Sequence, residues 1–200
     1  MHQPSELFNR IVELQRSGAE DRVDQIWNEF GCERAVLVLD STGFTRITNL
    51  HGIVHYLEIL AQLRQTVIPL FDSHGSLRSR AEADNIYAEF ESVAPALDAA
   101  IEANRVVEEQ GLMLTESEPF SVCIGIGFGQ VLECGHDGLY GGEMNLASKL
   151  GEDTAESREI LLTEAAWAAL PEKRREDFEE RVTGIVGTSI RYYWMHLPRT

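Results

Sequence analysis

The sequence predicts a single α/β domain, a ferredoxin-like sandwich, that follows a helical N-terminal extension. Two observations favour this fold over a doubly wound sheet. Short apolar runs typical of strands alternate with amphipathic helical patterns, and no repeat or linker interrupts them. The 200 residues, 44% of them apolar, are enough for one buried core. We expect the extension to cover residues 1–32 and the α/β domain to cover residues 33–200.

Apolar side chains at helical spacing predict two short helices in the extension. They form two groups: Leu7, Phe8, Ile11 and Val12, then Val23, Ile26, Trp27 and Phe30. Gly18 and Gly31 are natural ends for these helices, because glycine tolerates the conformations that follow a helix. The extension should therefore end where the first strand begins.

The first strand of the domain is predicted at residues 35–39, an unbroken apolar run of the kind buried on both faces. It ends at Asp40, and residues 41–45 turn the chain. A long amphipathic helix should follow from about residue 53, and we expect Pro69 to kink or end it.

The rest of the chain predicts two hairpins, further helices and a final strand pair. The first hairpin should turn at Ala83-Asp84-Asn85, and a helix should run from Pro95 to Gly111. The later expected elements are strands at 120–125 and 130–134, a helix at 144–150, a strand at 160–162, a helix at 164–170, and strands at 181–185 and 190–195.

Composition excludes several classes of partner and location. Asp and Glu number 33 against 17 Lys and Arg, a net charge of -16 without a basic stripe, so we expect neither nucleic acid nor an anionic membrane as partner. No apolar run approaches the roughly 20 residues that span a bilayer. The N-terminus lacks a signal-peptide pattern and three cysteines are widely spaced, which indicates a cytoplasmic protein with free thiols.

Two aspartates could form a metal site if they meet at neighbouring strand ends. Asp40 and Asp84, with the carbonyl of Ser41, would make a hard oxygen site suited to Mg²⁺ or Mn²⁺. The alternative is that Asp40 caps the next helix and Asp84 fills a turn. Gly43-Phe44-Thr45 lies where a helix follows a strand, so its N–H groups could bind phosphate, although a glycine there is often only structural.

Three motifs together resemble the catalytic domain of class III nucleotidyl cyclases. Asp40-Ser41-Thr42-Gly43-Phe44-Thr45 is similar to the family's D-x-x-G-F-T opening, and Ala83-Asp84 resembles its G-D hairpin tip. Asn145-Leu146-Ala147-Ser148-Lys149 is similar to its N-x-A-x-R helix. The match runs in order from about residue 35 to 195 and implies that residues 33–200 are a catalytic domain.

The resemblance implies a role for each matching residue. Asp40, Asp84 and the Ser41 carbonyl would hold two divalent ions, Mn²⁺ or Mg²⁺, and Gly43, Phe44 and Thr45 would bind the triphosphate. Asn145 would position the ribose and Lys149 would stabilise charge in the transition state. The family works as a head-to-tail homodimer, so the partner chain would complete each of two shared sites. The reaction implied converts a nucleoside triphosphate to a 3′,5′-cyclic nucleotide and pyrophosphate, which two metal ions suit well.

The sequence departs from the family at four places. Lys149 stands for an arginine, and Thr183-Gly184 stands for a Lys-Gly that reaches the terminal phosphate. At the two positions where the family recognises the purine base, this sequence has Arg80 and Gly138. If the match to the family is shifted by one residue, Asp137 takes the place of Gly138. The residues that usually select a purine are therefore not present at these two positions.

These departures favour a pyrimidine substrate, because a guanidinium suits the carbonyl oxygens of uracil and cytosine. We expect UTP ahead of CTP, with ATP as the main alternative and GTP also possible on the same chemistry. Small cyclases resembling this one include bacterial anti-phage enzymes that make cyclic UMP or cyclic CMP as second messengers. The competing hypothesis is a catalytically silent, cyclase-like nucleotide-binding module, which the joint presence of Asp40, Asp84 and Asn145 disfavours.

Overall fold

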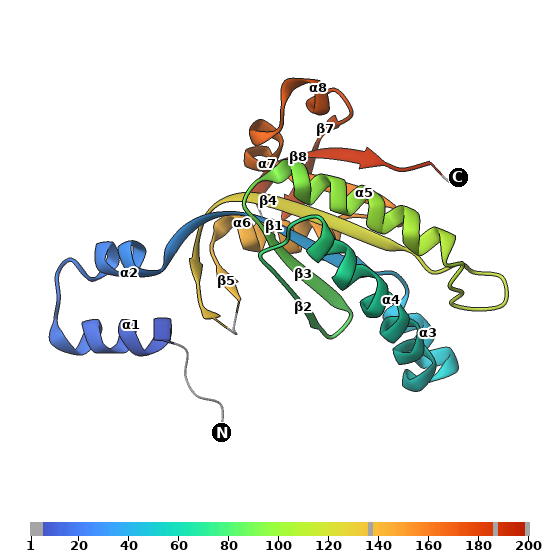
Figure 1. The fold of residues 1–200 in the computed structure, drawn as a ribbon, viewed down its shortest axis with the longest axis horizontal. Coiled ribbons are helices and arrows are strands. Elements are labelled where there is room, and N and C mark those ends of the chain that lie inside the picture. The colour runs from blue at the N-terminus through green and yellow to red at the C-terminus, as the bar shows by residue number, and fades with distance from the viewer. Residues whose placement is uncertain (1–5, 136–137, 186–187, 199–200) are drawn as a thin grey trace.

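The computed structural model describes residues 6–135, 138–185 and 188–198. Within them the strands form one eight-stranded sheet in the order β2-β3-β1-β4-β6-β8-β7, with β5 paired to β4 (Figure 1). The strands are β1 Gly31–Ser41, β2 Arg78–Glu82, β3 Asn85–Phe90, β4 Val122–Glu133, β5 Leu139–Tyr140, β6 Glu159–Thr163, β7 Glu179–Ile185 and β8 Thr188–His196. The predicted mixed α/β architecture with a helical N-terminal segment is confirmed.

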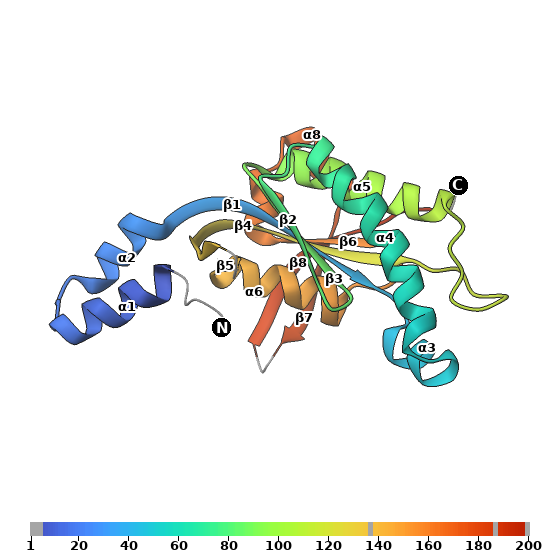
Figure 2. The same cartoon turned by 60° about the horizontal axis from the view of Figure 1, so that its bottom comes forward.

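Helices cover both faces of the sheet. The helices are α1 Glu6–Ser17, α2 Arg22–Phe30, α3 Phe44–His51, α4 Ile53–Ser73, α5 Val93–Glu109, α6 Gly142–Ser148, α7 Glu164–Ala169 and α8 Glu172–Arg175, and a π-helical turn spans Lys149–Thr154. Figure 2 shows α4 and α5 on one side of the sheet and α6 on the other. In the described ranges, no helix is long and apolar enough to cross a membrane.

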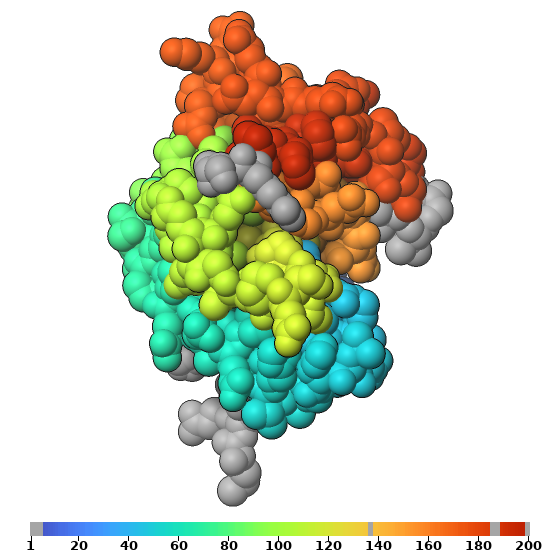
Figure 3. Space-filling model, turned by 90° about the vertical axis from the view of Figure 1, so that its right-hand side faces the viewer, coloured from blue at the N-terminus to red at the C-terminus, as the bar shows by residue number. Residues whose placement is uncertain are grey.

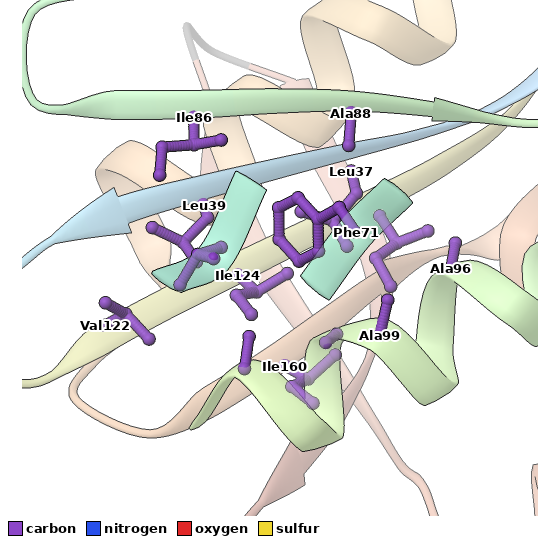
Figure 4. Close-up of a cluster of buried hydrophobic side chains, with 14 of the residues drawn as sticks. Leu37, Leu39, Phe71, Ile86, Ala88, Ala96, Ala99, Val122, Ile124 and Ile160 are labelled. Carbon is purple, nitrogen blue, oxygen red and sulfur yellow. The ribbon is translucent and has the colours of Figure 1, made fainter. Parts of the chain in front are cut away.

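The central strand β1 supplies the core on both faces. Residues Ala35 to Leu39 are fully buried, as the unbroken apolar run predicts. Their side chains alternate, so Leu37 and Leu39 join the large core against α4 and α5 (Figure 4), whereas Val36 and Val38 pack against α6. Its two neighbours, β3 and β4, both run antiparallel to it. Asp40, at the end of this strand, is therefore held by a rigid support.

The two predicted N-terminal helices are present and pack on each other outside the sheet. Leu7, Leu14 and Ile26 are buried between them and against Cys134 near the end of β4. α2 ends at Gly31, where only glycine fits, because the Cβ of any other residue would lie 2.3 Å from the carbonyl oxygen of Trp27. β1 begins at this same residue, so no linker separates the helical pair from the sheet.

The predicted hairpin of strands at 120–125 and 130–134 is wrong, because one continuous strand, β4, covers Val122–Glu133. It pairs with β1 over the whole length of β1. Two glycines of this strand make room for a helix: a Cβ on Gly125 would lie 2.1 Å from the carbonyl oxygen of Ala147 in α6, and one on Gly127 would lie 2.5 Å from that of Glu143. They allow a helix to approach the strand closely.

Of the two outcomes expected for Pro69, a kink or an end of the helix, the end is not observed. Pro69 lies inside α4, which continues to Ser73. The chain instead breaks earlier, at Gly52, whose positive φ of 86° separates α3 from α4. A proline so near a helix end removes one hydrogen bond from the ladder, and the buried side chains of Val67 and Phe71 on either side hold the last turn in place.

Candidate functional site

The carboxylates of Asp40 and Asp84 share one electrostatic environment at the end of β1 and the tip of the β2–β3 hairpin. Burial, and after it the negative charge of Asp84, raise the pKa of Asp40 to about 7. The backbone N–H of Ser41 donates to Oδ1 of Asp40 at 2.8 Å and opposes this shift. The residue that precedes α3 is Gly43, and no side chain caps this helix, so the alternative role of Asp40 as a helix cap is wrong.

A third carboxylate, Glu152, lies near this pair and was missed by the sequence analysis. Its charge and that of Asp153 also raise the pKa of Asp40. Burial raises the pKa of Glu152 itself, while the hydroxyl of Tyr87 donates to its Oε1 at 3.2 Å. Gly151 brings this turn against the sheet, because its Cβ position is 2.8 Å from the carbonyl oxygen of Val38. The acidic pair directly after a predicted helix was the available signal.

The donor set suits a divalent cation. Among the described residues, no ion pair joins Asp40 or Asp84 to a lysine or arginine, and no basic side chain offsets the repulsion that raises the pKa of Asp40, whereas Glu152 feels the charge of Lys149. No group of three or more His, Cys, Asp and Glu is arranged as a metal site within the described ranges. Two carboxylates and a carbonyl would therefore need phosphate oxygens to complete a six-ligand shell.

A buried tyrosine fixes the backbone of the two residues that follow Asp40. The fully buried Tyr56 donates from its hydroxyl to the carbonyl oxygen of Thr42 at 3.0 Å. Because its single proton is used there, the hydroxyl of Ser41 is the donor in the 2.9 Å bond between Ser41 and Tyr56. Desolvation raises the pKa of Tyr56 to about 12. The conformation of residues 41 and 42 is thereby set by α4.

The predicted phosphate-binding segment lies at the start of α3. Gly43 precedes the helix with a φ of 85°, a conformation that favours glycine, and its Cβ position is 3.0 Å from Leu114. The ring of Phe44 packs edge-on against Tyr56, with 5.1 Å between centroids. No acidic residue occupies the first turn of α3, which leaves the helix N-terminus open to an anion.

Asn145 and Lys149 are both exposed and lie one helical turn apart on the same side of α6 and the π-helical turn. The Nζ of Lys149 pairs with Oδ2 of Asp153 at 2.6 Å, and this hydrogen bond raises the pKa of the lysine. The ammonium group is therefore charged and held by an acidic neighbour. A phosphate approaching it would compete with Asp153.

The structure brings Arg80 and Gly138 into contact. The guanidinium of Arg80 stacks over the ring of Tyr87 at 4.5 Å and binds Glu82 at 3.0 Å. A Cβ on Gly138 would lie 2.5 Å from an Arg80 nitrogen, and the residue has a φ of 87°. Tyr87 was missed because an aromatic in a strand is usually a packing residue. Asp137, the alternative partner, lies outside the described residues.

Thr183-Gly184 lies on β7, an edge strand separated from β1 by β4, β6 and β8. Within one chain it is therefore remote from Asp40. Cys32, Cys123 and Cys134 are not joined in disulfides, as predicted, and burial raises the pKa of Cys123 well above its usual range.

Comparison with known proteins identifies the fold. No protein-family model matches the chain, and neither does any curated protein. An adenylate/guanylate cyclase/hydrolase from Silicibacter pomeroyi is similar in structure, with a TM-score of 0.72 and 18% identity over 84% of this chain and 98% of that chain. The adenylyl cyclase CyaB from P. aeruginosa has a TM-score of 0.65 and 18% identity over 84% and 96%.

A guanylyl cyclase domain of the RhoGC fusion protein from the aquatic fungus Blastocladiella emersonii, described as a non-canonical dimer, is also similar. Its TM-score is 0.67 and its identity 16%, over 82% of this chain and 97% of that chain. Each of these solved domains is covered almost completely, so the likeness extends over a whole domain. The chain therefore has the fold of the class III adenylate and guanylate cyclase catalytic domains.

Proposed function

We propose that the protein is a nucleotidyl cyclase that converts a nucleoside triphosphate to a 3′,5′-cyclic nucleotide and pyrophosphate. The observation that carries this proposal is the uncompensated carboxylate cluster of Asp40 and Asp84, at the end of the central strand of a cyclase fold. Repulsion between carboxylates costs stability unless a cation is bound, and a triphosphate normally arrives with such cations. Residues 33–200 would form the catalytic domain.

Asp40, Asp84 and the carbonyl of Ser41 would hold two divalent ions, Mg²⁺ or Mn²⁺. When bound, such ions neutralise phosphate charge and favour attack by the ribose 3′-hydroxyl on the α-phosphate. The free N–H groups at the start of α3, from Gly43 to Thr45, would bind the phosphate chain. Tyr56 contributes by keeping residues 41 and 42 in one conformation before substrate arrives.

Asn145 and Lys149 would act on the ribose and the reacting phosphate. Both side chains are exposed on α6 and its π-helical extension, which a second chain could approach. Resemblance to a family of head-to-tail dimers supports a homodimer with shared sites, and a structurally similar domain, described as a non-canonical dimer, shows that this fold can pair with itself. Lys149 would leave Asp153 to bind phosphate, an exchange of one anionic partner for another.

We infer that the base is a pyrimidine, with UTP preferred to CTP. Arg80 lies between the ring of Tyr87 and the backbone of Gly138, which leaves a planar group with several donors and no opposing side chain at residue 138. Carbonyl oxygens of uracil and cytosine are good acceptors for such a group. ATP remains the alternative substrate. A cyclic pyrimidine nucleotide made in this way would suit an anti-phage second messenger.

The second candidate is a nucleotide-binding module without turnover. The observation in its favour is the ion pair between Lys149 and Asp153, which occupies the basic side chain proposed to act on the transition state. Binding of a triphosphate without formation of cyclic product would identify such a module.

Product analysis tests both proposals. The protein is incubated with each of the four triphosphates, with Mn²⁺ or Mg²⁺, and cyclic nucleotides are quantified. Cyclic UMP as the main product in an equimolar mixture is the expected result. Predominant cyclic AMP or cyclic GMP would refute the pyrimidine assignment alone, whereas no product from any triphosphate would refute the cyclase assignment.

Complementation tests the shared site. Asp40→Ala and Asn145→Ala are each expected to be inactive, and a co-refolded mixture should regain part of the activity because a heterodimer keeps one intact site. Glu91→Gln, an exposed acidic residue just after β3, is the matched control and should remain active. Heterodimers that form but stay inactive would contradict the shared site.

A further inference from the structure

Two exposed apolar patches lie at opposite ends of the molecule. The first is on the N-terminal arm, defined here as α1 and α2, residues 6–30. The second is on the elbow, defined here as the α3–α4 junction, residues 44–57. Figures 1 and 2 both show the arm at one end and α3 at the other, so the two patches cannot meet within one chain. Figure 3 views the end that carries the elbow.

The arm is a preformed structure with an apolar outer surface. Arg10 ties the two helices together, binding Glu29 at 2.9 Å and Gln25 at 3.1 Å. Val23 is 59% exposed, and Trp27 is also exposed. Both line a groove of about 250 Å³ whose other apolar walls are Ile11, Leu14 and Ile26 of the two helices and Leu132 of β4.

The elbow exposes a compact group of aliphatic side chains. Leu50 and Val54 are each 66% exposed, and Ile53 and Leu57 are also exposed. The positive φ of Gly52 makes the sharp turn that brings the end of α3 and the start of α4 into one surface. Large side chains gathered this way are typical of a surface that another molecule covers.

Charge favours the arm of a second chain as the molecule that covers the elbow. The arm carries six acidic and three basic residues, so it would be repelled by most of the surface of a protein of net charge -16. The elbow is an exception because residues 44–57 contain no acidic residue. Its one arginine, Arg46, pairs with Glu118, and His51 and His55 add no negative charge. Glu58 follows the elbow directly and Glu118 is neutralised by Arg46, so the local charge is small and the elbow repels the acidic arm only weakly.

We propose that in the homodimer the arm of each protomer packs on the elbow of the other. This inference rests on the proposed dimer and adds the surfaces that hold it together. Two different patches at opposite ends of a chain are both covered in a closed head-to-tail pair, because the two-fold axis makes each contact twice. Apolar burial then supplies association energy at both ends.

The contact also adjoins the candidate site. The elbow begins at Phe44 in the proposed phosphate-binding segment and contains Tyr56, which holds Ser41 and Thr42. A partner's arm on the elbow therefore packs on the element that positions the proposed metal and phosphate ligands. Dimer formation and ordering of the site would be coupled.

Single substitutions on each surface provide the first test. Val23→Lys on the arm and Val54→Asp on the elbow should each raise the dimer dissociation constant about tenfold or more, measured by sedimentation without nucleotide or metal. Val182→Asp is the matched control, because Val182 is 62% exposed on the distant edge strand β7, and its dissociation constant should stay within about twofold of the wild type. Leu50→Asp replaces Val54→Asp if the latter does not fold by circular dichroism.

Mixing the two variants provides the decisive test. In a heterodimer of Val23→Lys and Val54→Asp protomers, one arm–elbow contact is unaltered and the other pairs a lysine with an aspartate. Heterodimers should therefore exceed the statistical half of all dimers. A wild-type monomer, dissociation constants that match the control, or a statistical mixture would each overturn the proposal. Because no substrate is present, these outcomes are independent of whether the protein makes a cyclic nucleotide.

Discussion

Acidic residues near the two ends of β1 have opposite kinds of charged neighbours. In the arm, Glu29 and Glu13 are bound by Arg10, and the hydrogen bond from Arg10 holds the pKa of Glu29 below its usual value. At the other end, Asp40 has carboxylates for neighbours, and its pKa is raised to about 7. Paired acids stabilise local structure, whereas unpaired, half-buried acids cost stability and are typical of a site completed by a ligand.

Loss of either aspartate should have the largest effect. Asp40→Asn and Asp84→Asn are each expected to lower turnover by about 1000-fold or more, because an uncharged amide leaves phosphate charge uncompensated in an acidic protein. Cyclic nucleotide formation under saturating Mn²⁺ measures this. Well-folded variants with more than a tenth of the wild-type rate would contradict the metal assignment.

The same Asp40→Asn variant should be more stable than the wild type at pH 8 in the presence of a chelator. Because the pKa of Asp40 in the folded protein, about 7, lies above its ordinary value of 3.8, the folded state binds this proton more tightly than the unfolded chain does. The contribution to stability is present at low pH and is lost as the pH rises from about 4 to 7.

Removing the carboxylate should recover up to about 4 kcal/mol at pH 8, an upper limit because solvent reaches part of the site. Urea unfolding at pH 8 and at pH 4 measures the difference, which should vanish at pH 4. A variant that is less stable than the wild type at pH 8 would show that Asp40 is stabilised by a contact other than those described.

Divalent ions should reverse the effect of the unpaired acids. Millimolar Mn²⁺ is expected to raise the melting temperature of the wild type by a few degrees at pH 8, less at pH 6 where protons compete for Asp40, and not in Asp40→Asn. Differential scanning fluorimetry with Ca²⁺ and Na⁺ as comparisons measures the shift. An equal rise in the Asp40→Asn variant would place the binding elsewhere.

The paired acids should give the smallest effect. Glu29→Gln removes an exposed ion pair and is expected to lower the melting temperature by only about 1 °C, with a smaller difference at high salt. Cyclase activity should be unchanged. A large loss of stability would mean that the arm is held mainly by this pair and not by Leu7, Leu14 and Ile26.

The sequence was most informative where local pattern and chain order agree. The run from Ala35 to Leu39, followed by Asp40, predicted both the central strand and the position of the candidate site, because an apolar run interrupted by a carboxylate is a local signal. The hairpin tip at Asp84 was predicted from another local signal, the turn residues Ala83-Asp84-Asn85 between two candidate strands. The assignment of roles to these residues came from the family resemblance and stays a prediction.

Contacts between distant segments could not be predicted in this way. The sequence predicts a break between residues 125 and 130, yet the strand is continuous there, and Gly125 and Gly127 leave the space that α6, some twenty residues later, needs. Glu152 and Tyr87 joined the site only through folding, since they are 65 residues apart in the chain and meet in a hydrogen bond. Pro69 gave a local signal that tertiary packing outweighed.

The glycines of β4 have a consequence for the rate of the proposed reaction. They set the depth at which α6 lies on the sheet, since even one methyl group at Gly125 would overlap the carbonyl oxygen of Ala147. The helix would have to move outward by about 1 Å, and Asn145 and Lys149 would move with it. A displacement of about 1 Å can slow a reaction about 100-fold. Positions that carry no functional group at all would thereby determine how fast two groups on another element can act.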